Sequence, residues 1–258
     1  TVLPHDISVS EAKLEEGVVL QLVRGKCKNV VMCKRRVGGR VKQPYAAAIP
    51  DSVTVIGDSA FGGCAFLTEV QIPNSVTDIG EHAFAFCTSL TGVQIPNSVT
   101  SIGECAFAGC TSLTEVRIPK SVTIIDVGAF NGCTSLTEVH IPNSVTMVGL
   151  CAFESCTSLA ELQLPETLKI IGDCAFGDCT SLTKVQIPNS VTSIGHNAFN
   201  HCSSLTEIRI PNSVTSIGNF AFEACTSLTE VQLPDYVTSM GDFVFKGCTS
   251  LTFERLAS

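Results

Sequence analysis

A spacing of 23 residues runs through most of this chain of 258 residues. Proline recurs at that interval nine times, and a phenylalanine, a cysteine and a leucine follow each proline at fixed distances. The series run from Pro50 to Pro234, from Phe61 to Phe245, from Cys64 to Cys248 and from Leu67 to Leu251. A fixed period of this length, without insertions, is typical of repeat proteins in which similar coils stack on one another.

One repeat reads LTEVQIPNSVTDIGEHAFAFCTS and begins at Leu67. Leu67, Val70 and Ile72 have the spacing of a short strand that turns alternate side chains inward. Pro73 ends this strand because it has no N–H group to donate. The apolar residues that follow form the return path of the coil, where Phe84 and its equivalents are predicted to stack as offset rings. The repeat therefore predicts nine stacked coils with parallel strands.

This unit resembles the BspA-like, or Treponema-type, class of leucine-rich repeats. The motifs that carry the resemblance are the consensus LTEVQIPNSVTSIG, then AF, then C, in that order, across residues 50–256. Asp126 in place of a glycine and Glu254 in place of an inward apolar residue are departures. The resemblance implies a solenoid shaped as an arc, with a parallel sheet on its concave face and irregular or short helical return segments. It also implies a role in surface adhesion or protein binding.

Residues 1–49 do not repeat and are predicted to form a small β-rich cap on the solenoid of residues 50–258. The segments VVLQLV and NVVMC read as two strands, KRRVGGRVKQ as a second hairpin, and Ser10 as the start of a short helical turn. Nine Lys or Arg oppose four Asp or Glu here, against seven opposing twenty in the rest of the chain. A cap that covers the first coil is preferred over binding of nucleic acid, for which stacking aromatic residues are lacking, or of an anionic membrane. Head-to-tail contact of this basic cap with the acidic solenoid of another copy is a further alternative.

Cysteines and histidines give no pattern of catalysis or metal binding, so we expect no enzyme activity, no metal and no cofactor. The column from Cys64 to Cys248 is predicted to be buried thiols, since no C-x-x-C pair occurs. Cys151 and Cys174 are either surface thiols or a disulfide, and Cys27 and Cys33 are the better disulfide candidates. The five histidines fall on different columns, and no nucleophile elbow or phosphate loop is present.

The outward residues of the strands form the first candidate binding surface, on the expected concave face. They are either a solvated polar face or a groove for a basic or polar partner, with Ca²⁺ as a remote variant. Ice binding by the recurrent threonines is disfavoured, since a glutamate follows most of them. The candidate residues are Glu115, Arg117, Glu138, His140, Glu161, Glu207, Arg209 and Glu230.

The second candidate surface lies at the C-terminal end. Phe220 and Phe243 occupy a column that is polar or small in earlier coils, and Phe253 interrupts the glutamate column. These rings are predicted either to contact a partner or another copy, or to be covered by the chain's own tail.

Two functions remain open at this point. The first is a non-catalytic protein-binding scaffold, extracellular or at a cell surface by resemblance alone, and the second is a structural spacer within a larger assembly. The chain begins at Thr1, so we expect a processed or trimmed N-terminus, and the lack of a visible signal leaves the compartment open.

Overall fold

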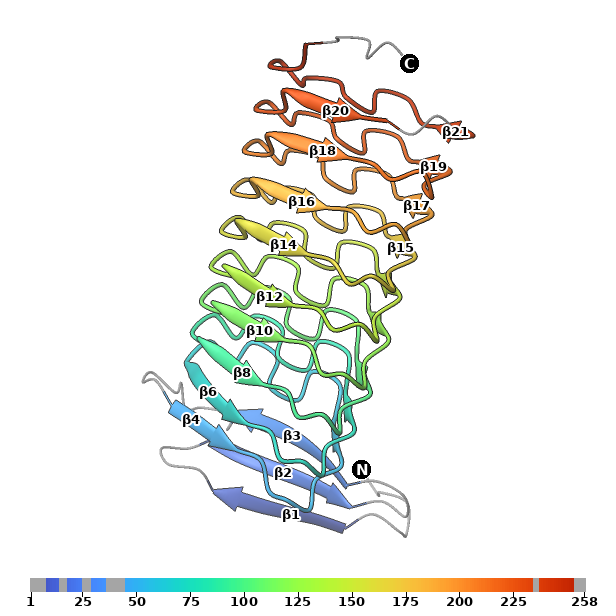
Figure 1. Ribbon diagram of the computed structural model, residues 1–258. Coiled ribbons are helices and arrows are strands. Elements are labelled where there is room, and N and C mark those ends of the chain that lie inside the picture. Colours follow the sequence, from blue (N-terminus) through green and yellow to red (C-terminus); the bar gives the residue numbers. More distant parts are fainter. Residues whose placement is uncertain (1–7, 14–17, 25–28, 36–44, 234–236, 253–258) are drawn as a thin grey trace.

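The computed structural model describes residues 8–13, 18–24, 29–35, 45–233 and 237–252 of the chain (Figure 1). These residues form a β-solenoid whose coils stack along one axis from the N-terminal to the C-terminal end. One buried apolar cluster runs through the stack from Ala47 to Val244. None of the described segments forms a helix that could span a membrane.

The first side of each coil contributes one strand to a parallel ladder. From β6 to β12, and again from β14 to β20, equivalent residues 23 positions apart lie opposite each other, as at Val116 and Val139, and the ladder divides between β12 and β14. This confirms the predicted parallel strands, while the strand expected after Leu251 lies outside the described residues. The strands are β4 (Tyr45–Ala48), β6 (Leu67–Gln71), β8 (Gly92–Gln94), β10 (Glu115–Arg117), β12 (Glu138–His140), β14 (Glu161–Gln163), β16 (Lys184–Gln186), β18 (Glu207–Arg209) and β20 (Glu230–Gln232).

The return path contains a second parallel ladder of two-residue strands, where the sequence predicted irregular or helical segments. The described residues contain no helix, so the helical part of that prediction has no support. From β5 to β19 each of these strands turns one residue inward, such as Ile79 or Ile194, whereas both residues of β21 are exposed. The strands are β5 (Val55–Ile56), β7 (Asp78–Ile79), β9 (Ser101–Ile102), β11 (Ile124–Ile125), β13 (Met147–Val148), β15 (Ile170–Ile171), β17 (Ser193–Ile194), β19 (Ser216–Ile217) and β21 (Ser239–Met240).

A third side of the coil carries the phenylalanine column. The N–H of Phe61 donates to the carbonyl of Ala83 at 2.7 Å, and the same bond joins Phe84 to Ala106. The nine rings from Phe61 to Phe245 stack in one series, with centroids 5.0 to 5.6 Å apart and interplanar angles of 1° to 13°. The predicted inner stack of offset rings is therefore confirmed.

The glycine column of the repeat keeps neighbouring coils in close contact. A Cβ atom at Gly80 would lie 2.7 Å from the backbone nitrogen of Asp58, and one at Gly149 would lie 2.9 Å from the carbonyl oxygen of Ile125. Asp126 is the departure from this column, and at its coil the second ladder divides between β9 and β11. We infer that the Asp126 side chain causes this division, because the backbones of adjacent coils lie too close together at the glycine column to admit a side chain.

The N-terminal strands extend the solenoid rather than standing apart from it. β1 (Ser8–Lys13), β2 (Val18–Arg24) and β3 (Asn29–Arg35) pair in antiparallel fashion, and β3 then pairs in parallel with β5. The predicted strands VVLQLV and NVVMC are confirmed. The helical turn predicted at Ser10 is wrong, because the segment pairs with β2 along its whole length. The boundary at residue 49 stays a prediction, and most of the second predicted hairpin lies outside the described residues.

We predict that removal of one central ring weakens the whole stack. Phe153 is fully buried between two rings, so Phe153→Ala should lower the free energy of unfolding by about 3–5 kcal/mol. Urea denaturation followed by circular dichroism measures this. Phe86→Asn is the control: its ring is 63% exposed and its φ is 58°, which asparagine tolerates. A similar loss in both variants would contradict the role given to the stack.

Candidate functional site

The outward residues of β6 to β20, here called the sheet face, form a polar surface that continues from coil to coil. In strands β10 to β18 the central residue is buried and its two neighbours are exposed. All eight residues predicted for this face are accordingly exposed on it: Glu115, Arg117, Glu138, His140, Glu161, Glu207, Arg209 and Glu230.

Charges on the sheet face are paired only in part. The Nε atom of Arg117 lies 2.7 Å from Glu115 Oε1, and this hydrogen bond raises the pKa of the guanidinium. The Nζ atom of Lys184 lies 3.4 Å from Glu207 Oε1. Glu138 stands directly opposite Glu115 in the ladder, and like charges so close repel in water by about 1 kcal/mol before salt screening. The face therefore carries net negative charge.

Two hollows lie on the sheet face, each between the strands and the turns that follow them. The first has a volume of about 1150 Å³ and is lined by Glu115, Arg117 and residues of the preceding coils. The second has a volume of about 960 Å³ and is lined by Glu138, His140 and Glu161, among others. The structure thus brings five of the eight predicted residues into hollows, while Glu207, Arg209 and Glu230 lie beyond them.

The C-terminal patch contains two stacked rings. Phe220 and Phe243 have centroids 5.4 Å apart, and Phe243 is 61% exposed. Lys246 Nζ lies 5.7 Å from both ring centroids and 2.9 Å from Glu223 Oε1, so a cation covers one side of the pair. Phe253, the third predicted member of the patch, lies outside the described residues.

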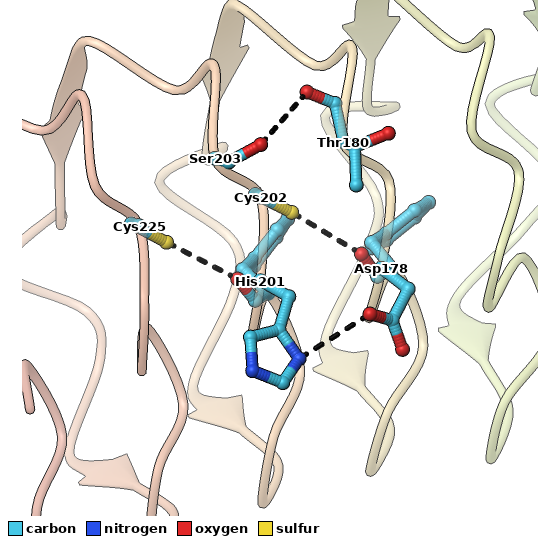
Figure 2. A network of polar contacts seen from close by, with 8 residues as sticks. Asp178, Thr180, His201, Cys202, Ser203 and Cys225 are labelled. Atoms are coloured by element: carbon cyan, nitrogen blue, oxygen red, sulfur yellow. Dashed lines mark hydrogen bonds and ion pairs between the residues drawn. The ribbon is translucent and has the colours of Figure 1, made fainter. Parts of the chain in front are cut away.

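The inner cysteine column consists mostly of buried thiols that donate hydrogen bonds to backbone carbonyls. Cys202 Sγ donates to the carbonyl of Phe176 at 3.3 Å, and Cys225 Sγ donates to Phe199 at 3.2 Å (Figure 2). Burial raises the pKa of Cys133 and of Cys179 to about 12, so neither is a thiolate at neutral pH. The predicted burial is confirmed along the column except at Cys248, which is partly exposed because no described coil covers it.

The histidines are dispersed, and their neighbours explain three of them. His201 Nδ1 lies 3.3 Å from Asp178 Oδ1 on the preceding coil (Figure 2). His196 Nδ1 accepts a hydrogen bond from the backbone N–H of Asn219 at 2.8 Å, which links two coils. His82 lies beside Glu81, with 3.3 Å between Nε2 and Oε1.

An outer column that begins at Ser59 has a backbone conformation that the sequence analysis missed. Its residues have φ between 51° and 58°, the left-handed region that side chains other than glycine rarely adopt. The column holds Ser59, His82, Cys105, Gly128, Cys151, Cys174, Asn197, Phe220 and Phe243. Because these residues are not mostly glycine, local sequence gave no signal of the turn, whereas the 23-residue register did place them in one column.

Cys151 and Cys174 meet a third group that was not anticipated. Ligand atoms of Cys151, Glu154 and Cys174 all lie within 4.8 Å of one another, and each residue is partly buried. Both cysteines are free thiols, so the disulfide alternative is not formed in this structure. The available signal was C-x-x-E on one coil with a cysteine 23 residues after the first. Of the other candidate pair, Cys27 lies outside the described residues.

The in-register coils and the buried leucine, phenylalanine and cysteine columns define a leucine-rich-repeat solenoid. The BspA type leucine rich repeat region, in six copies, matches residues 45–160 and 151–257. The chain therefore belongs to the BspA-type leucine-rich repeat family.

One solved structure agrees with this assignment, and a second is similar to the chain in sequence. A leucine-rich cell surface protein from Faecalibacterium prausnitzii is 28% identical, with 95% of this chain and 82% of that chain covered and a TM-score of 0.55. The leucine-rich repeat protein of Treponema pallidum is also 28% identical, with 93% and 90% covered and a TM-score of 0.43. No curated protein matches the chain.

We predict that the buried thiols make the fold sensitive to alkali. The pKa of Cys133 and Cys179 is about 12 in the fold against 9.0 for an ordinary thiol, so the folded state holds its protons longer. The contribution of these two thiols to the free energy of unfolding is complete below pH 9.0 and is lost as the pH rises toward 12. The slope is about 1.4 kcal/mol per pH unit for each thiol.

Urea unfolding at about pH 9.5 to about pH 11, which lies between the two pKa values, tests this prediction. The variants are Cys133→Ala, Cys179→Ala and the double variant. The double variant should be less stable than the parent at pH 8 but lose stability more slowly as the pH rises, by roughly 2.7 kcal/mol per unit. Equal slopes in parent and double variant would show that these thiols do not contribute.

Proposed function

We propose that this protein is a non-catalytic scaffold that binds another protein through its sheet face, outside the cell or at the cell surface. The observation that carries the proposal is a row of exposed glutamates that line two hollows. Glu115 lines the first hollow, and Glu138 and Glu161 line the second. Membership in a leucine-rich repeat family supports protein binding, and the likeness to a protein described as a cell surface protein supports the location.

The chemistry of the face favours a basic or polar partner. Glu138 and Glu161 line the same hollow, and their carboxylates repel each other when no cation lies between them. A lysine or arginine side chain from a partner would relieve that repulsion and gain charge-assisted hydrogen bonds. Arg117 stands in the neighbouring column at the first hollow, where its positive charge limits the negative field. His140 stands in the same column at the second hollow and offers a hydrogen-bonding ring.

Charge reversal at the second hollow tests this proposal. The double variant Glu138→Lys and Glu161→Lys should abolish capture of surface-protein extract components that the immobilised parent retains. It should slow association with an isolated basic partner by about tenfold or more at low salt. Surface plasmon resonance at two salt concentrations measures the rate.

The matched control is Glu81→Lys with Glu104→Lys, which changes the net charge equally at exposed positions away from the sheet face. Loss of capture by both double variants would indicate a bulk charge effect rather than a site. Unchanged capture by the sheet-face variant would exclude the second hollow as the binding site and would favour contacts elsewhere, as in a structural spacer.

A second contact is favoured at the C-terminal end, where we infer association with another copy of this chain. Phe220 and Phe243 stack at the last coils, and Leu233 and Met240 of the same end are 47% and 48% exposed. The basic N-terminal region of one copy offers charge complementary to the acidic solenoid of the next.

We predict that Phe220→Asn with Phe243→Asn weakens self-association. Burial of both rings contributes about 3–5 kcal/mol, so the dissociation constant should rise by about 100-fold or more. Asparagine is chosen because Asn197 occupies the same column with φ of 54°. Light scattering over a concentration series measures the change, with Phe86→Asn as the control. A parent that stays monomeric throughout, or a variant that associates equally, would contradict the inference.

A further inference from the structure

We propose that Cys151, Glu154 and Cys174 form a Zn²⁺ site that links two neighbouring coils of the solenoid. Their two sulfur atoms and one carboxylate oxygen already lie within 4.8 Å of one another. Cys151 and Glu154 come from one coil and Cys174 from the next, so a bound ion would join residues 23 positions apart. Thiolate and carboxylate oxygen are both ordinary zinc ligands.

The backbone holds the two sulfur atoms on the same side of adjacent coils. Cys151 and Cys174 have φ of 52° and 53°, and each N–H donates to a carbonyl of the next coil at 2.8 Å. The N–H of Glu154 donates to the carbonyl of Cys151 at 3.2 Å, within the same tight turn. Three ligands on backbone that is already fixed lose little freedom when an ion binds.

A second residue orients the carboxylate. Asn131 Nδ2, on the preceding coil, donates to Glu154 Oε2 at 2.8 Å. Hydrogen bonds of this kind to metal-ligating carboxylates fix their orientation, and their loss lowers metal affinity by about 10- to 100-fold. Asn131 therefore acts as a positioning residue, while the carboxylate itself contacts the ion.

Acidic side chains surround the two thiols. Glu154 lies beside both sulfur atoms, and Asp173 and Asp178 add negative charge near Cys174. Negative charge of this kind attracts a cation. A zinc ion binds both sulfurs and displaces one proton from each, so that Zn²⁺ and two thiols give a dithiolate complex and two protons.

Three protein ligands leave one position of a tetrahedral zinc ion open. Water fills that position in the isolated protein, and a side chain of a bound protein can replace it. The site therefore differs from the acidic sheet face in both its ligands and its place on the coil.

The chain supplies a matched control at Cys105. This thiol lies in the same column, is also partly buried and has φ of 51°. The next residue in the column is Gly128, where a Cβ atom would lie 2.8 Å from the Cys105 sulfur, so no second sulfur adjoins it. Asparagine suits every position of the column, as Asn197 does.

The test uses the full chain, reduced and then freed of reductant, with Zn²⁺ as the probe in competition with a chromophoric chelator. We expect one zinc ion per chain, and Cd²⁺ should give the ultraviolet charge-transfer band of a metal thiolate. Cys174→Asn should bind zinc at least about 100-fold more weakly and lose the band, and Glu154→Gln should also bind weakly. Cys105→Asn should match the parent.

Asn131→Ala should lose about 10- to 100-fold in zinc affinity while the metal-free protein melts as the parent does. Because two thiol protons leave, the apparent affinity of the parent should rise by about 100-fold per pH unit near neutrality. Zinc should raise the melting temperature of the parent and of Cys105→Asn but not of Cys174→Asn.

Three results would overturn the proposal. They are no zinc uptake by the reduced parent, equal loss of affinity in Cys105→Asn and Cys174→Asn, and closure of the pair to a disulfide in a protein whose reduced form takes up no zinc. The inner thiols do not confuse the measurement in folded protein, because the column from Cys87 to Cys225 is fully buried.

Discussion

The in-register hydrogen bonding of one coil to the next is the constraint on which the rest of this structure depends. Residues 23 positions apart face each other in the strand ladders, as at Val185 and Ile208 or at Ile194 and Ile217. Equivalent side chains therefore stack at roughly the strand spacing of 4.8 Å. Such a column favours a residue type whose copies attract one another when they are in contact. Phenylalanine does so through offset stacking of its rings, and cysteine does so through close packing of neutral thiols. Glutamate gains nothing from such contact and stacks only where water or a counter-charge surrounds it.

The same constraint explains which parts of the fold could be predicted. The interior columns from Phe61 and from Leu67 followed from the period alone, because a buried column repeats its residue. The second ladder was not foreseen, since two-residue strands such as Asp78–Ile79 are too short to show an alternating pattern. The segment at Ser10 was misjudged because its local sequence suits a helix start, whereas pairing with β2 decides its structure.

Exterior residues were predicted less well for a different physical reason. The sheet face could be placed because strand alternation fixes which side chains point outward. The left-handed turns could not, since Cys151 and Phe220 carry no local sign of a positive φ, and only the ladders on either side impose it. Glu154 was missed as a neighbour of the cysteines because the contact depends on the shape of that turn.

Departures from the repeat are where this solenoid gains features that a uniform stack cannot have. Asp126 and Ala160 are substitutions within otherwise regular columns, and they coincide with the divisions of the second and first ladders respectively. The outer column beginning at Ser59 varies in residue type while its backbone conformation stays the same. Different pairs of side chains are therefore held in the same relative position at successive coils. Two thiols meet at one step of that column and two rings at another. A partner or an ion that needs groups from two coils can therefore be recognised at one step of the stack without any change in the core, because the inward columns and the backbone ladders already hold the coils together.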